Sequence, residues 1–225
     1  MKKKPPCRIH LIHAAAAPVA VVLRHGPGDW THLALLDTQT DILTHGAWFN
    51  GRVYENSCDL SPDGELFLYK ALPSIKTVRA KNAKSAKGAK SVLAEIPSGD
   101  AAELRGAWTA ISRPPWLVPL ARWSHGNAWD GGGYFTEPRK LTILSRHEIQ
   151  SERPQSLFDL PEELDVSFQY DKPHAGAPNV SACCRDLDGN LISARDGKIF
   201  RQIKWQCGKE VEIADLTMLR PPKNK

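Results

Sequence analysis

The stretch PVAVVLRHGPGDWTHLALL, residues 18–36, decides the class of fold that we expect for this chain. Two apolar runs, Pro18–Leu23 and Trp30–Leu36, are separated by the segment His25–Asp29, whose glycines and proline are typical of a tight turn. Short apolar runs on both sides of such a turn indicate a β-hairpin made of buried strands.

Short apolar runs bounded by turn residues continue along the rest of the chain. Leu164, Val166 and Phe168 alternate with polar neighbours, which is the period of a half-buried strand. Asp188-Gly189 and Asp196-Gly197 indicate hairpins, because glycine adopts positive φ angles without cost. Further strands are expected at Ile42–Trp48, Glu65–Leu72, Arg139–Leu144, Asn190–Arg195 and Lys198–Trp205. Helical turns are expected at Pro114–Leu120, Pro154–Glu163 and Val211–Leu219.

These patterns predict a mainly β fold of antiparallel hairpins and meanders with few short helices, one form of which is an incomplete propeller-like blade array. The chain has 225 residues, 41% hydrophobic and 24% charged, which is ordinary for a folded domain. We expect a single β-rich domain over residues 1–225, with a basic tail at 1–6. A flexible insert is expected at about residues 73–105, because this Lys- and Ala-rich stretch has too little apolar surface to offset the entropy of ordering it.

Positive charge is concentrated in the tail, in residues 76–90 of the insert and in the last six residues, which together hold twelve of the 30 Lys and Arg residues. The rest of the chain has 18 basic and 25 acidic residues and is therefore an acidic body. The cations of the insert are Lys76, Arg79, Lys81, Lys84, Lys87 and Lys90. Spaced lysines neutralise phosphates without reading sequence, so weak non-specific nucleic-acid contact is one expectation and a solubilising loop is the other.

The cysteines indicate a reducing compartment. The chain has five, an odd number, and Cys183 and Cys184 are adjacent, which does not match a usual disulfide framework. The run Ala14–Leu23 has the outline of a secretory signal, but Pro18 interrupts it and the run is too short to span a bilayer. We therefore expect a cytoplasmic protein with no membrane partner.

Linear signatures of common enzyme classes are missing, among them the phosphate-binding loop, His-Glu-x-x-His and Gly-x-Ser-x-Gly. His10 and His13 are three residues apart, which on a strand places them on opposite faces. A zinc site is conceivable from Cys183, Cys184, Cys207 and His174, and small buried thiols are the simpler interpretation. We expect no metal and no cofactor, and these absences lean against an enzyme.

The segment Trp108–Phe135 is unusually dense in aromatic residues. Aromatic side chains interleaved with arginine are typical of recognition surfaces, whereas tryptophans also fill the core of β folds. Arg113 precedes two prolines, which hold its backbone extended and favour it as a functional residue. The candidate binding residues are Arg113, Trp116, Trp123, His125 and Trp129.

Two stretches resemble known families. DLSPDGELFLY, residues 59–69, resembles a β-propeller blade of the WD-repeat-like or TolB-like kind, which implies a local hairpin at the Ser-Pro-Asp-Gly turn. GAWFNGRVY (46–54), WTAISRPPWL (108–117) and WDGGG (129–133), together with that turn, resemble an uncharacterised family of bacterial hypothetical proteins. This second resemblance implies a bacterial cytosolic setting and brings no known activity or site residue.

The aromatic segment and the missing signatures favour a non-enzymatic module that binds a protein or small ligand through residues 108–135. One alternative is an enzyme of unrecognised type, with a hydrolase-like site assembled from residues scattered along the chain. Another is an immunity-type protein whose acidic body neutralises a basic partner.

Overall fold

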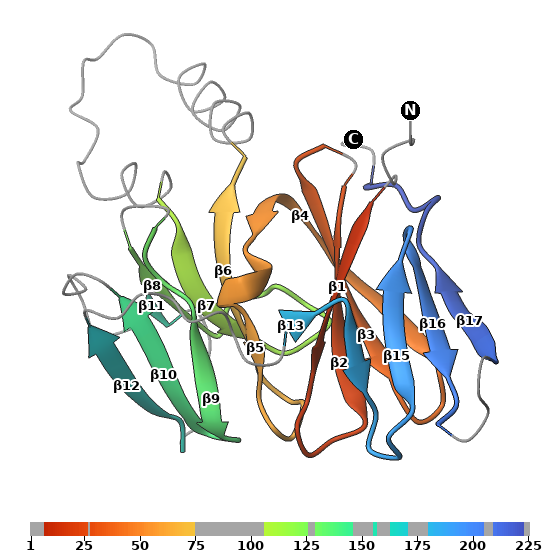
Figure 1. Ribbon diagram of the computed structural model, residues 1–225. Coiled ribbons are helices and arrows are strands. Elements are labelled where there is room, and N and C mark those ends of the chain that lie inside the picture. The colour runs from red at the N-terminus through yellow and green to blue at the C-terminus, as the bar shows by residue number, and fades with distance from the viewer. Residues whose placement is uncertain are drawn as a thin grey trace, which may run out of the picture.

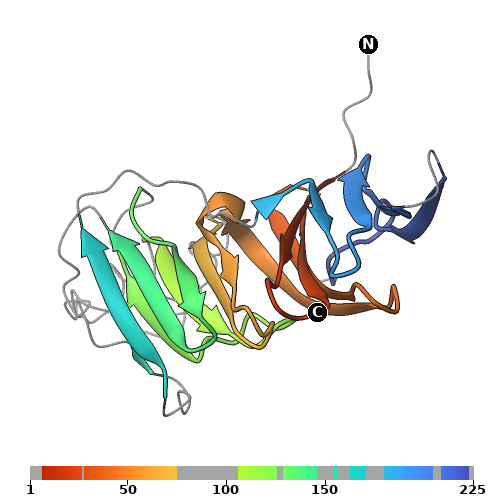
Figure 2. The ribbon, with the colours of Figure 1, turned by 60° about the horizontal axis from the view of Figure 1, so that its bottom comes forward.

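A computed structural model describes residues 7–26, 28–74, 106–125, 129–145, 155–156, 163–170, 180–204 and 209–222. These residues form three sheets and one short 3-10 helix, η1 (Glu55–Ser57), so the predicted mainly β fold of antiparallel hairpins and meanders is confirmed. The smaller sheets lie on opposite sides of a curled ten-stranded sheet (Figures 1 and 2). No helix in these ranges is long and apolar enough to cross a membrane.

The ten-stranded sheet contains the predicted hairpin. β2 (Val19–His25) and β3 (Trp30–Asp37) pair antiparallel from Val19 opposite Asp37 to His25 opposite Thr31, so this prediction is confirmed. The strand order is β11-β8-β7-β6-β4-β3-β2-β1-β13, with β5 paired to β6. The other strands are β1 (Arg8–His13), β4 (Leu43–Val53), β5 (Asp59–Leu60), β6 (Phe67–Pro73), β7 (Trp108–Ser112), β8 (Ala121–Ser124), β11 (Gln155–Ser156) and β13 (Val180–Ser181).

The two smaller sheets come from the second half of the chain. The three-stranded sheet has the order β12-β10-β9, and the four-stranded sheet is a meander, β14-β15-β16-β17. Their strands are β9 (Gly133–Glu137), β10 (Lys140–Ser145), β12 (Asp165–Tyr170), β14 (Cys183–Arg185), β15 (Leu191–Arg195), β16 (Lys198–Gln202) and β17 (Glu210–Asp215). A propeller blade has four strands. Among the described sheets, the β14–β17 meander has this number, but the Ser61–Gly64 turn that resembles a blade hairpin lies in the ten-stranded sheet.

Turn chemistry explains the local connections. Asp196 and Gly197 join β15 to β16 with φ angles of 51° and 81°, the doubly left-handed conformation that suits a two-residue hairpin. In the Ser-Pro-Asp-Gly turn, Ser61 Oγ accepts a hydrogen bond from the backbone N–H of Leu66 at 2.9 Å, and Gly64 has a φ of 77°. The first turn was predicted from its Asp-Gly pair, and the second from the Ser-Pro-Asp-Gly stretch and its resemblance to a propeller blade hairpin.

The expectation of helical turns is wrong at two places. Residues 211–215 belong to β17, and residues 114–120 form a turn followed by irregular chain, because three prolines there lack the N–H that a helix requires. Most of Pro154–Glu163 lies outside the described residues. The predicted tail at 1–6 and nearly all of the predicted insert, including its six cations, also lie outside them.

Three apolar clusters hold the sheets together. One fills the inside of the curl, where Leu23 and Leu33 face Val53, Phe67 and Tyr69. A second lies between the ten-stranded sheet and the four-stranded sheet, and a third between the ten-stranded and three-stranded sheets. Successive side chains of a strand point to opposite faces of its sheet. Side chains of β1, β2 and β3 therefore alternate between the first cluster, inside the curl, and the second cluster, outside it.

Candidate metal centre

Pairing of β1 with β2 brings two histidines together at one end of the inner cluster. His10 pairs with Leu23 and His25 pairs with Arg8, so the two histidines are diagonal neighbours on the same face of the sheet. Their ring centroids are 5.4 Å apart, and the ring planes meet at 75°. On the same face of the sheet, His10 lies next to the buried Ile12 and His25 lies next to the buried Leu23. The two histidines therefore mark the point where the apolar cluster ends.

Glu55, in η1, completes the cluster. Its carboxylate oxygens lie 3.7 Å from Nε2 of His10 and 3.6 Å from Nε2 of His25, too far for hydrogen bonds. Both Nε2 atoms are buried and have no hydrogen-bond partner. All three ligand atoms lie within 4.8 Å of one another. Zinc bonds of about 2.0–2.1 Å in a tetrahedron separate neighbouring ligand atoms by about 3.3 Å, so small inward shifts would let one ion bind all three.

Thr31 orients the ring of His25. Its hydroxyl oxygen lies 3.0 Å from the carbonyl oxygen of Gly51, to which it donates, and 3.3 Å from Nδ1 of His25. Because the Thr31 hydrogen is used on Gly51, its oxygen accepts the Nδ1 hydrogen of His25. The neutral ring then carries its lone pair on Nε2, which faces Glu55. Metal-binding histidines are usually held by such a second hydrogen bond.

The electrostatics of the cluster favour neutral histidines beside an ionised carboxylate. Burial lowers the pKa of both His10 and His25, although the charge of Glu55 opposes this. Burial acts to raise the pKa of Glu55, but a hydrogen bond from its own backbone N–H and the charges of the histidines and Arg52 outweigh it, and the pKa is lowered. These are the protonation states that a metal ion requires of such ligands.

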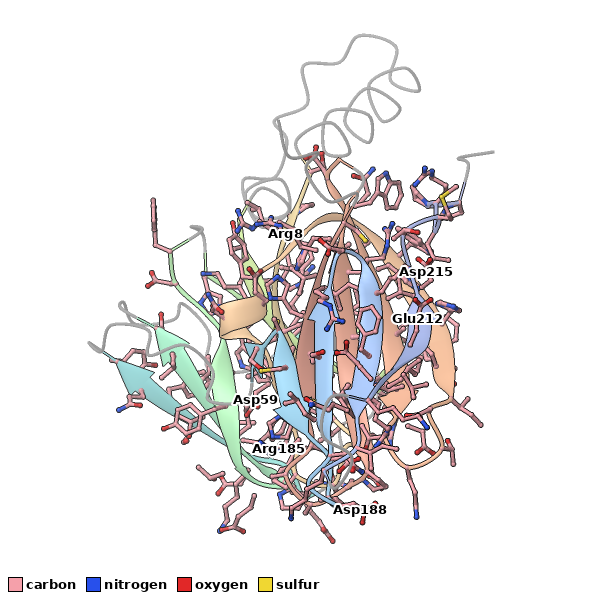
Figure 3. All side chains as sticks on the ribbon, turned by 45° about the vertical axis from the view of Figure 1, so that its right-hand side comes forward. Arg8, Asp59, Arg185, Asp188, Glu212 and Asp215 are labelled. Carbon is pink, nitrogen blue, oxygen red and sulfur yellow. The ribbon has the colours of Figure 1, made fainter. Side chains whose placement is uncertain are left out.

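Arg8 and Arg52 border this cluster. Arg8 lies directly opposite His25 in the β1–β2 pairing, in the upper half of the view in Figure 3. Arg52 lies on β4, three residues before Glu55, with its guanidinium 5.0 Å from the ring of Tyr54. Both side chains are exposed, so positive charge lies at the surface beside the cluster.

The structure separates the five candidate binding residues. Trp123 is 1% exposed and packs in the third apolar cluster, so it is a core residue and not part of a binding surface. Nε2 of His125 lies 2.7 Å from the hydroxyl oxygen of Thr109, which also accepts the N–H of Gly132. Arg113 is exposed, and Trp116 and Trp129 are 55% and 77% exposed.

Trp116 and Trp129 lie at opposite ends of the β7–β8 hairpin. Trp116 is in the loop after the Ile111–Ala121 pair, whereas Trp129 follows the end where Trp108 pairs with Ser124. A strand of this length separates its ends by about 13 Å. The expected single recognition surface over residues 108–135 is therefore divided, and Arg113 and Trp116 remain together on one loop.

The prediction that His10 and His13 lie on opposite faces is confirmed, since His10 is in the cluster and His13 is not. The expectation of no metal site overlooked His25 and Glu55, because their distances from His10 along the chain match no ligand motif. Cys183 is exposed and Cys184 buried, as expected for adjacent strand residues, and both are free thiols. Cys207 and His174 lie outside the described residues.

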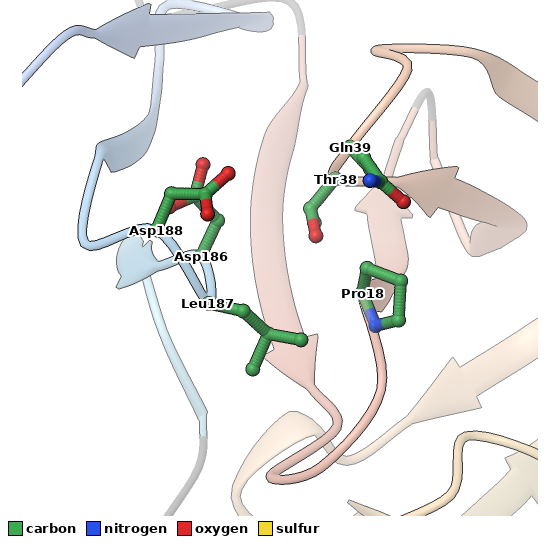
Figure 4. Close-up of a pocket in the computed structure, with 6 residues that line it drawn as sticks. All are labelled: Pro18, Thr38, Gln39, Asp186, Leu187 and Asp188. Carbon is green, nitrogen blue, oxygen red and sulfur yellow. The ribbon is translucent and has the colours of Figure 1, made fainter.

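A recess lies between the ten-stranded and four-stranded sheets and has a volume of about 130 Å³ (Figure 4). Its wall contains Pro18, Thr38, Gln39, Asp186, Leu187 and Asp188. The carboxylate of Asp186 already accepts hydrogen bonds from Arg201 and Asn190, and Arg201 also donates to Asp41. These contacts make the recess a junction between the two sheets, because its buried carboxylate is already paired within the protein.

Comparison of the chain with protein-family models, with curated proteins and with solved structures finds no match.

Proposed function

We propose that this protein binds a divalent transition metal ion through His10, His25 and Glu55, and that Zn²⁺ is the preferred ion. The observation that carries the proposal is the convergence of two unpartnered histidine nitrogens on one carboxylate, with all three ligand atoms within 4.8 Å of one another. Two nitrogens and one carboxylate oxygen are a donor set typical of zinc.

Such a site supports hydrolytic chemistry. Zinc sites with two histidines and one glutamate keep a fourth position for water, and the metal lowers the pKa of that water to about 7. The side chains of His10, His25 and Glu55 are 23%, 12% and 15% exposed, so the cluster lies close to the protein surface. This supports the alternative of an enzyme whose hydrolase-like site is assembled from scattered residues.

The test is a calorimetric titration of metal-free protein with Zn²⁺. We expect one ion per chain, and we expect His10→Ala, His25→Ala and Glu55→Gln each to weaken binding by about 100-fold or more, because each removes one of three protein ligands. His13→Ala is the matched control, since His13 lies on the same strand but faces away. Circular dichroism of the metal-free variants checks that each is folded.

Two results would overturn the metal proposal. One is a folded wild-type protein that binds no Zn²⁺ in the micromolar range. The other is Zn²⁺ binding that His13→Ala abolishes and Glu55→Gln leaves unchanged. Replacement of Zn²⁺ by Co²⁺ gives an independent readout, because the visible spectrum of Co²⁺ reports the number and geometry of its ligands.

Ligand binding through the aromatic segment is a second proposal, now restricted to the loop that follows β7. It is favoured by the 55% and 52% exposure of Trp116 and Val118 beside the exposed Arg113. A pull-down from a bacterial lysate should recover a partner with wild type and lose it with Arg113→Ala plus Trp116→Ala. Equal recovery by the folded double variant would refute this role for the loop.

A further inference from the structure

Arg8 and Arg52 carry charges that the fold does not neutralise. Each acts on the histidine cluster, and the described residues contain no carboxylate in an ion pair with either guanidinium. Two arginines of the smaller sheets differ in this respect: Arg139, just before β10, pairs with Asp63 and Glu65, and Arg195, on β15, pairs with Glu210. Two unpaired guanidiniums at the edge of one cluster indicate an anion-binding position.

The charge balance of the cluster defines the ligand further. Glu55 supplies one negative charge, whereas Arg8, Arg52 and a divalent ion together supply four positive charges. A singly charged ligand would leave most of this excess uncompensated. A phosphate group carries about −1.5 to −2 charge near neutral pH and has several acceptor oxygens, so one oxygen can bind the metal while others accept from guanidinium N–H groups.

We propose that the fourth position of the metal site binds a phosphate group, either free or as a monoester, and that Arg8 and Arg52 hold its remaining oxygens. This inference rests on the proposed metal function. Arg8 is placed for the role by its position directly opposite His25, and Arg52 by its strand, which leads into η1 and Glu55. Both arginines are exposed, so a ligand in solvent can reach their guanidiniums.

The experiment uses full-length protein loaded with one equivalent of Zn²⁺ and dialysed to remove free metal, which would precipitate phosphate. Inorganic phosphate, phenyl phosphate and acetate are titrated into wild type, Arg8→Gln and Arg52→Gln. Arg185→Gln is the matched control, because Arg185 is also an exposed strand arginine but lies well away from Arg8, in the lower half of the view in Figure 3.

We expect both phosphates to bind wild type and acetate to bind far more weakly. Each of Arg8→Gln and Arg52→Gln should weaken phosphate binding by about tenfold, as loss of one charge-assisted hydrogen bond does, with the affinity for Zn²⁺ unchanged. Tighter binding of phenyl phosphate than of inorganic phosphate would assign the site to esters, and the reverse order would assign it to free phosphate.

Four results overturn this inference. If Zn²⁺ binds but phosphate does not, or if phosphate binds the two arginine variants as tightly as it binds wild type, the anion position is wrong and the metal site stands. Equal phosphate affinity with and without Zn²⁺ places the anion elsewhere and likewise leaves the metal site intact. If wild type binds no Zn²⁺, the proposed function fails and this inference fails with it.

Discussion

Nε of Arg24, on β2, donates a hydrogen bond of 2.8 Å to the carbonyl oxygen of Leu216, which lies 192 residues later in the chain. The same guanidinium donates to the carbonyls of Gly26 and Leu219 and lies 5.7 Å from the ring of Trp48. Arg24 is fully buried, so its charge is stabilised by these oxygens and by the aromatic ring. It ties the chain after β17 to the ten-stranded sheet.

Replacement of Arg24 by methionine should destabilise the protein by about 3 kcal/mol, because the apolar stem is kept while several buried carbonyls lose their donor. Urea denaturation measures the change. Arg185→Met, at an exposed position, should change stability by less than about 0.5 kcal/mol. Equal stabilities of the two variants would show that the Arg24 contacts do not support the fold.

Thr31 should act as a positioning residue for the metal site. Thr31→Val removes the oxygen that accepts the Nδ1 hydrogen of His25 while it keeps the volume, and Zn²⁺ affinity should fall by about tenfold. Thr31→Ser keeps the hydroxyl and should restore most of the affinity. Zn²⁺ affinity is measured by calorimetry on metal-free wild type, Thr31→Val and Thr31→Ser, each shown first to be folded. A change in affinity among folded proteins then reports on positioning of His25 and not on a general loss of stability. If Thr31→Val binds Zn²⁺ as tightly as wild type, His25 needs no such support.

Stability should fall as the pH decreases from about 6.5 to about 4, in part because of His32. Burial is the main reason why the pKa of His32 is lowered to about 4, and the nearby His45 and Arg24 lower it further. The hydrogen bond from His32 to the carbonyl of Ala47 acts in the other direction and raises the pKa. In the unfolded chain the pKa is near 6.5, so between these values the unfolded state binds one more proton than the folded state. The loss reaches at most about 3 kcal/mol and does not grow below pH 4.

His32→Gln isolates this contribution, since His10 and His25 also have lowered pKa values. The slope of unfolding free energy against pH between 4 and 6.5 should be smaller in the variant than in wild type by about one proton. Identical slopes would mean that His32 takes up its proton in the folded state as readily as in the unfolded state.

Gly197 and Gly28 form a matched pair of left-handed glycines, with φ angles of 81° and 65°. A Cβ at Gly197 would lie 2.8 Å from both Sγ of Cys7 and Cγ2 of Thr217, whereas a Cβ at Gly28 would have no atom within 4 Å. Alanine at either site bears the cost of a left-handed backbone, about 1–2 kcal/mol. Gly197→Ala should cost about 1 kcal/mol more, as measured by thermal unfolding, because the neighbouring atoms must also shift. A larger cost at Gly28 would contradict this assignment of the crowding.

Much of the local structure was predictable from residues close together in the chain. The β2–β3 hairpin follows from two apolar runs and a Gly-Pro-Gly turn, and the β15–β16 hairpin follows from Asp196-Gly197. The helical periodicity at 211–219 was misleading, because residues 211–215 pair with β16 and this tertiary contact overrides a weak local preference.

The candidate site was far less predictable. Trp123 and Trp116 are both tryptophans of one aromatic segment, yet one is 1% exposed and the other 55%. Trp123 faces the core because the three-stranded sheet covers one face of β8. The residues of the aromatic segment do not reveal which face of the strand that sheet will cover. The nucleic-acid contact expected of the insert and the neutralisation of a basic partner stay predictions.

The sequence by itself determined that this chain forms short, mostly antiparallel strands joined by tight turns, because alternation of apolar residues and the backbone freedom of glycine act over a few residues. Only the tertiary structure decided that His10, His25 and Glu55 meet. Those residues come from β1, β2 and η1, and the pairing register and the curl of the ten-stranded sheet bring them together. A contact made by long-range packing leaves no fixed spacing in the sequence, so only the folded chain reveals it.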